Sequence, residues 1–156
     1  MNSLFEQKVK HAYECYLNGI PRRKVYAVIE KGDKFIVGKF SKPRNYKYFL
    51  AGGGIEEGED VITACIRECS EELNVNVEFV NTLDVIRDKS TWNYNGFEFE
   101  VDDEMNIVYT KFVSYAENNQ FGIDGEFDTQ DVYAEITREE MLSSVAEFAH
   151  YGIELE

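Results

Sequence analysis

Apolar residues recur along this chain at two spacings, which predict both helices and strands. Residues 4–18 place apolar side chains three and four positions apart, the spacing of an amphipathic helix. Apolar and polar side chains alternate in residues 24–31 and in residues 34–40. Gly32-Asp33 separates the two segments, which predicts a β-hairpin. Further strands are expected at residues 47–50, 75–86, 97–101, 106–116 and 132–136. The residues between the later strands, 87–96 and 102–105, are polar and are expected to form loops.

Two more helical segments carry recognisable ends. Residues 61–73 contain neither Gly nor Pro, Asp60 precedes them as an N-cap residue, and Asn74 follows where a left-handed residue would end the helix. Thr137 is placed to cap a final helix over residues 138–150. Strands mixed with three helices predict the α+β or the α/β class, with α+β the first choice and a mixed β-sheet packed between helices.

The length of 156 residues, 44% of them hydrophobic, suits one domain with a buried core. We therefore expect a single domain over residues 1–156, in which an N-terminal helix within residues 1–19 precedes a core of residues 20–156. No stretch is apolar enough to span a membrane, and the first residues lack the features of a secretory signal, so we expect a cytoplasmic protein. Cys15, Cys65 and Cys69 form no CxxC pair, and we expect free buried thiols.

Charge is distributed unevenly along the chain. The formal net charge of -14 argues against general nucleic-acid binding, because such binding needs a basic face. Residues 1–49 hold eleven Lys and Arg against four Asp and Glu, whereas residues 50–156 hold five against 26. A basic patch and an acidic region in one domain suggest a site that handles both a metal and an anion.

Acidic residues crowd into residues 56–72, which contain seven Asp and Glu and a single basic residue, Arg67. Glu68, Glu71 and Glu72 share a helix face, where like charges destabilise a helix by about 0.2–0.5 kcal/mol per pair. A divalent cation removes this conflict, and carboxylate oxygens suit Mg²⁺ or Mn²⁺. The alternative is a solvated acidic helix, but such a helix usually places Lys or Arg four residues from each Glu. Here only Arg67 and Glu71 form such a pair.

The same stretch resembles the signature of the Nudix hydrolases, the MutT-like nucleoside diphosphate-X pyrophosphohydrolases. The signature reads G-x5-E-x7-R-E-U-x-E-E-x-G-U, where U is a bulky aliphatic residue. Its first Gly and its charged positions fall on Gly53, Glu59, Arg67, Glu68, Glu71 and Glu72. Cys69 at the first U and Asn74 in place of the last Gly depart from it, but neither is a charged position. The resemblance implies the Nudix fold, an α/β/α sandwich, which fits the elements expected around the signature.

The resemblance also implies an activity and roles for these residues. The implied reaction is hydrolysis of the pyrophosphate linkage in a nucleoside diphosphate derivative, with Mg²⁺ or Mn²⁺ as cofactor. Glu68 and Glu72 would bind the metal, Glu71 would be a further ligand or the base, and Arg67 would orient these glutamates. The backbone of Gly52, Gly53 and Gly54 would approach the metal or the phosphates, and Glu59 would support the site from the loop. The resemblance implies a small nucleotide as the binding partner. It is also compatible with a homodimer, because many members of the family dimerise.

Several residues outside the signature are further candidates. The family often draws one more acid from a later loop, and Glu126 is the first choice here. The candidates for contacts with the substrate are Lys39, Arg44 and Lys47 for its phosphates, and Tyr48 and Trp92 for its base. Each has a structural alternative, which is a solvated loop for the charged residues and packing on the core for the aromatic ones.

Two other classes of function are alternatives to an active hydrolase. A Nudix-fold nucleotide sensor would bind without turnover, but such proteins commonly lack the catalytic glutamates, all of which are present here. A structural protein that docks through its N-terminal helix would leave the acidic signature unexplained.

Overall fold

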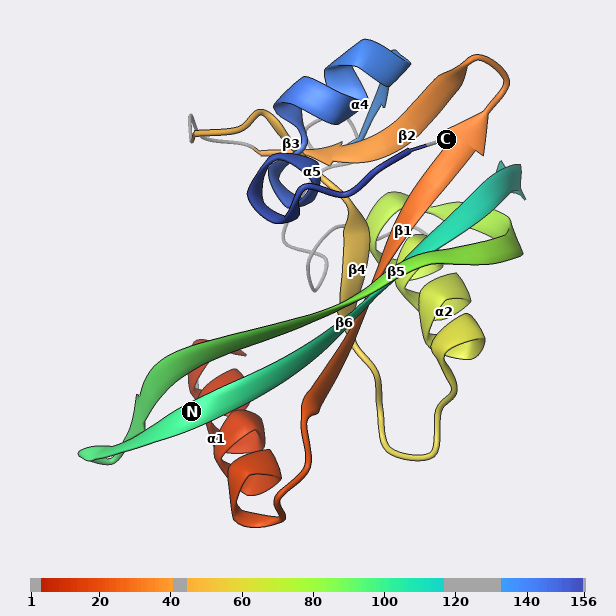
Figure 1. The fold of residues 1–156 in the computed structure, drawn as a ribbon. Coiled ribbons are helices and arrows are strands. Elements are labelled where there is room, and N and C mark those ends of the chain that lie inside the picture. The colour runs from red at the N-terminus through yellow and green to blue at the C-terminus, as the bar shows by residue number, and fades with distance from the viewer. Residues whose placement is uncertain (1–3, 41–44, 117–132, 156) are drawn as a thin grey trace.

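A seven-stranded mixed sheet occupies the centre of the molecule. The computed structural model describes residues 4–40, 45–116 and 133–155 (Figure 1). In chain order the elements are α1 (Leu4–Leu17), β1 (Arg22–Lys31), β2 (Lys34–Lys39), β3 (Tyr48–Phe49), β4 (Ala51–Gly54), α2 (Val61–Leu73), β5 (Val75–Tyr94), β6 (Phe97–Tyr115), β7 (Tyr133–Ile136), α4 (Arg138–Ser144) and α5 (Ala146–Tyr151). The α+β class is confirmed.

Strand β1 organises the sheet because three other strands, β2, β4 and β6, pair with it directly. It pairs in parallel with β6 along residues 22–30, and β6 pairs antiparallel with β5. On its other side, β1 pairs with β2 only over residues 29–31 and with β4 over residues 24–27. Strand β2 then pairs with β3 and β7. The glycine-rich strand β4, for which the sequence predicted no element, therefore lies beside the first half of β1.

Alternate residues of β1 face two different helical layers, as expected for a sheet between helices. Val25, Ala27 and Ile29 are buried in a cluster with residues of α2. Val28 lies in a second buried cluster, with Met141 of α4 and residues that include Phe148 of α5. The two clusters form the hydrophobic core on the two faces of the sheet, and they fix α2 to one face and α4 and α5 to the other.

Most predicted ends of elements are confirmed. Asp60 caps α2 by accepting a hydrogen bond from the Thr63 N–H at 2.7 Å, and Asn74 ends it with φ 57°. Thr137 caps α4 in a capping box with Glu140. The predicted hairpin at Gly32-Asp33 and the N-terminal helix are present. Cys15, Cys65 and Cys69 are buried free thiols.

Two predictions about the later elements were wrong. The polar segments 87–96 and 102–105 are not loops between separate strands, because β5 and β6 run through them as one long hairpin. It turns at Asn95 and Gly96, which have φ of 51° and 84°, the positive values that a type I′ turn requires. The final helix is broken at Val145, which is extended at φ -95° and ψ 126° and forms a bridge with Tyr48.

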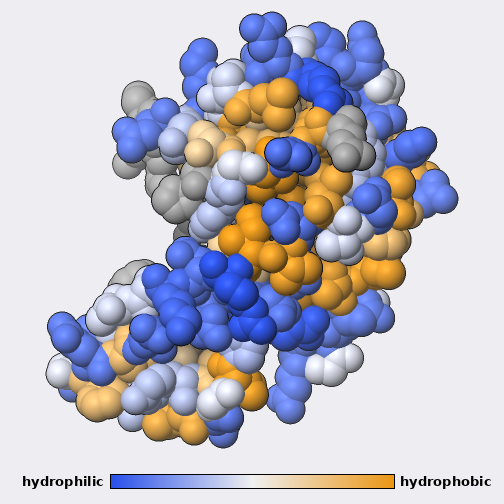
Figure 2. Space-filling model, viewed as in Figure 1, coloured by the Kyte–Doolittle hydropathy of each residue, from blue (hydrophilic) through white to orange (hydrophobic). Residues whose placement is uncertain are grey.

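The outer part of the hairpin, residues 87–102, extends away from the rest of the sheet and is called the arm below (Figure 1). Helix α1 packs against it through a cluster that contains Ala12, Phe99 and Val101. The lobe that contains the arm has a mixed surface of hydrophilic and apolar groups, and a larger apolar area lies over the middle of the same face (Figure 2). Arg22 and Asp103 form a buried pair where the arm begins, with Nε and Oδ1 2.7 Å apart.

None of the helices in the part of the chain that the structure describes is both long enough and apolar enough to cross a membrane.

Candidate active site

Helix α2 presents its charged residues beside strand β4 because its apolar face is committed to the sheet. Ala64, Cys65, Cys69 and Leu73 are buried at helical spacing. The charged residues Arg67, Glu68 and Glu72 are only partly exposed, whereas Glu71 faces solvent with 58% of its side chain exposed. The caps at Asp60 and Asn74 fix where the helix begins and ends, so the sequence determines which residues meet β4.

Arg67 connects three parts of the site through one guanidinium group. Its Nε and Nη2 donate to the two carboxylate oxygens of Glu59 at 2.8 and 2.9 Å, a bidentate pair. Its Nη1 donates to Glu68 at 3.0 Å and to Glu71 at 3.2 Å. Its Nη2 also donates to the carbonyl oxygen of Gly54 at 3.1 Å. The hydrogen bond from Arg67 lowers the pKa of Glu59, which stays ionised and holds the loop to the helix.

Glu68 lies directly against the backbone of Gly53. A methyl group added at Gly53 would come within 2.7 Å of the Glu68 Oε1, a separation that non-bonded atoms do not tolerate. Only 12% of the Glu68 side chain is exposed, and burial raises its pKa despite the hydrogen bond from Arg67. The glycine therefore makes room for a carboxylate at this position.

Glu72 is the most strongly perturbed carboxyl group of the site. Burial, and then the charge of Glu68, raise the pKa of Glu72 to about 9, although a backbone hydrogen bond from Gly52 acts in the opposite direction. A divalent cation beside Glu72 would favour the ionised form by direct charge attraction. The residues present fit Mg²⁺ or Mn²⁺ in this respect, because they offer hard carboxylate oxygens in a partly dehydrated place.

The carboxylates do not form a complete set of metal ligands by themselves. Among the described residues, no group of three or more His, Cys, Asp and Glu side chains is arranged to hold a metal ion. Glu68 and Glu72 would hold the ion together with water and substrate phosphate oxygens, which is the usual mode for Mg²⁺. Glu71 forms an ion pair with Arg67 on the exposed side of the helix.

The structure places the other candidate residues in different parts of the molecule. Lys39 ends β2 and Lys47 precedes β3, and both are exposed, whereas Tyr48 is partly buried in β3. Trp92 lies in the arm, where its ring centroid is 4.5 Å from the Arg22 guanidinium and its side chain packs near α1. The structure thus groups Trp92 with α1 rather than with the glutamates of α2. Arg44 and Glu126 lie outside the described residues.

Sequence reasoning missed one carboxylate, Glu147 of α5. Both of its carboxylate oxygens accept from the Leu50 N–H at 3.2 Å, immediately before β4. Burial raises the pKa of Glu147 to about 7, and its charge contributes to the raised pKa of Glu72. No signal in the sequence marks it, because a lone Glu near the end of the chain has the pattern of a solvated helical residue.

Comparison with known proteins gives the same fold. The sequence profile of the NUDIX domain matches residues 20–149. A solved NUDIX hydrolase from Nitrosomonas europaea is similar with a TM-score of 0.54 and 24% identity, covering 80% of this chain and 77% of that one. A further structure of a NUDIX hydrolase from the same organism gives 0.55 and 18%, covering 81% and 63%. A UDP-X diphosphatase gives 0.53 and 14%, covering 87% and 60%. No curated protein sequence matches the chain.

Proposed function

Because the chain belongs to the NUDIX domain family, we propose that it is a divalent-metal-dependent hydrolase that cleaves the pyrophosphate linkage of a nucleoside diphosphate derivative. The observation that carries this proposal is the pairing of Glu68 and Glu72 beside the glycines of β4. One carboxylate lies against Gly53, and the other is hydrogen-bonded by the Gly52 backbone. The other charged residues of the signature are retained, and Arg67 forms ion pairs with Glu59, Glu68 and Glu71.

The proposed reaction breaks one phosphoric anhydride bond. The oxygen of a water molecule forms a bond to one phosphorus, and the bridging oxygen leaves with the other phosphate. Bound Mg²⁺ or Mn²⁺ would neutralise phosphate charge and lower the pKa of a coordinated water. Glu68 and Glu72 would hold the ion, and Arg67 keeps Glu68 in place while Glu59 fixes Arg67. Glu71 is the exposed acid beside them, available as a further ligand or as the base.

The substrate class is the open part of the proposal. Nucleoside triphosphates, dinucleotide polyphosphates and nucleotide sugars all contain the linkage, and the similarity to a UDP-X diphosphatase makes UDP-sugars a sensible member of the panel. Lys39 and Lys47 are proposed to meet the phosphates, since both are exposed cations near the start of the β3–β4 segment.

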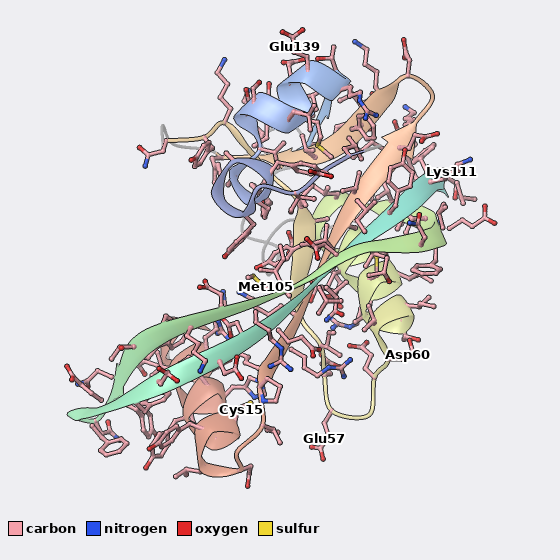
Figure 3. All side chains as sticks on the ribbon, viewed as in Figure 1. Cys15, Glu57, Asp60, Met105, Lys111 and Glu139 are labelled. Carbon is pink, nitrogen blue, oxygen red and sulfur yellow. The ribbon has the colours of Figure 1, made fainter. Side chains whose placement is uncertain are left out.

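The test is to incubate the protein with a panel of nucleotides and Mg²⁺ or Mn²⁺, and to measure the release of nucleoside monophosphate or phosphate. We expect turnover that EDTA abolishes, and Glu72→Gln should reduce kcat by about 100-fold or more while the protein stays folded. Glu57→Gln is the matched control, because Glu57 is an exposed acid of the loop before α2 (Figure 3). A rate for Glu72→Gln within a few-fold of the parent would refute this metal site. Saturable nucleotide binding without turnover would instead indicate a binding module.

A further inference from the structure

Residues 48–54 are held at successive positions by two helices that are distant in sequence. From the side of α5, Val145 forms a bridge with Tyr48, and Glu147 accepts the Leu50 N–H. From the side of α2, Glu72 accepts from the Gly52 backbone, Glu68 lies against Gly53, and Arg67 donates to the Gly54 carbonyl. The same seven residues therefore connect α5 to α2, the helix that carries the proposed metal ligands.

Leu50 is the point at which this segment changes partners. Phe49 pairs with Gly38 of β2, whereas Ala51 pairs with Ala27 of β1. Leu50 lies between the two ladders, and only 1% of it is exposed. A buried N–H without an acceptor is costly, and a carboxylate supplies a strong, charge-assisted bond. Glu147 thus fixes where the chain crosses from one strand partner to the other.

The amides of Leu50 and Gly52 are two residues apart in an extended segment. Such amides point to the same side of a strand, about 7 Å apart along it. Glu147 and Glu72 consequently lie along one edge of the segment, which agrees with the effect of the Glu147 charge on Glu72. A shift of the chain at Leu50 would be transmitted to Gly52, because only Ala51 lies between them, and from Gly52 to the adjacent Gly53.

We propose that Glu147 is a positioning residue of the catalytic centre, which sets the path of β4 against Glu68 and Glu72 by holding the Leu50 amide. This role depends on the length of the Glu147 side chain and on its acceptor oxygen. It does not involve metal ligation by Glu147. This inference rests on the proposed hydrolase function of the same site.

Two variants of Glu147 separate the effect of its side-chain length from the effect of its charge. Glu147→Gln keeps the length and one acceptor oxygen but removes the charge, while Glu147→Asp keeps the charge and shortens the side chain by one methylene. A misplacement of about 1 Å can cost about 100-fold in rate, so we expect Glu147→Asp to lower kcat by about 10- to 100-fold with KM changed little. Glu147→Gln should stay within about fivefold of the parent, because it still accepts from Leu50. Glu139→Gln is the control, since Glu139 is exposed at the outer end of α4 (Figure 3).

Hydrogen exchange of single amides, followed by NMR, gives a readout that needs no turnover. Glu147→Asp should speed exchange at both Leu50 and Gly52, whereas Glu147→Gln should leave Gly52 close to the parent. The proposal is overturned if Glu147→Asp is active and Glu147→Gln is not, if both variants match the parent, or if exchange at Gly52 never changes. A parent without turnover on any substrate would defeat the proposed function, and the exchange at Gly52 would still decide the role of Glu147.

Discussion

Gly53 and Gly54 are neighbours in β4 that differ in what a side chain would meet. At Gly53 an added methyl group would lie 2.7 Å from the Glu68 Oε1, whereas at Gly54 nothing lies within 4 Å. We expect Gly53→Ala to displace the Glu68 carboxylate and to weaken Mn²⁺ binding by about tenfold or more, with a corresponding loss of turnover. Manganese affinity measured by electron paramagnetic resonance tests this without any knowledge of the substrate.

Gly54→Ala is the matched control for this experiment. It makes the same chemical change one residue along the same strand and should keep the manganese affinity within about twofold, since no side-chain contact is created. Equal effects of the two substitutions would show that β4 tolerates or rejects side chains for reasons unrelated to Glu68.

Single residues also show how far the sequence alone could predict this site. The signature led to the expectation that Arg67 orients the neighbouring glutamates, and in the structure Arg67 donates to Glu68 and also to Glu59. Glu147 could not be found in this way, since its contact with Leu50 spans 97 positions in sequence. Such a contact depends on where α5 packs, which no local pattern specifies.

Among the elements, α2 has an unusual end for its family signature. Asn74 stands where the signature has Gly, and it adopts φ 57° with its N–H bonded to the carbonyls of Cys69 and Ser70. The left-handed conformation costs an ordinary residue about 1–2 kcal/mol, and Asn and Gly less. We expect Asn74→Ala to lower the free energy of unfolding by about 1 kcal/mol, and Asn74→Gly to leave it unchanged or slightly higher. Urea denaturation compares the three proteins, and an alanine variant as stable as the parent would contradict the argument.

The elements that were predicted wrongly differ from the predictions for two physical reasons. The arm is a two-stranded ribbon that meets solvent over much of its surface, so residues 87–96 carry few apolar side chains and have the pattern of a loop. The Asn95-Gly96 turn was the available local signal for a hairpin. The break at Val145 has no Gly or Pro to mark it, because a bridge with Tyr48 imposes the extended backbone there. Caps and tight turns are local and were predictable, whereas this bridge is a tertiary contact.

At the scale of the whole molecule, the fold brings buried carboxyl groups together in a chain that already carries a net charge of -14. Burial raises the pKa of Glu72 to about 9 and that of Glu147 to about 7, and it also raises the pKa of Glu68. These carboxyl groups act on the free energy of unfolding in the same direction. Without a metal, the folded protein is therefore more stable at low pH, where these groups are protonated. A bound divalent cation stabilises the folded protein at higher pH, because it binds the ionised carboxylates.

The pH dependence of stability follows from the sign of these shifts. Between the ordinary pKa of 4.5 and the raised value, Glu72 keeps its proton in the folded protein but loses it on unfolding. The unfolded chain then binds fewer protons, so the free energy of unfolding falls as pH rises. In EDTA we expect a fall on the order of 1–2 kcal/mol from about pH 5.5 to about pH 8.5, measured by urea denaturation. Glu72→Gln should flatten the curve, and Mg²⁺ should stabilise the parent more at the higher pH, because it binds the ionised form. Equal slopes for parent and variant would show that Glu72 is ionised in the folded protein throughout this range.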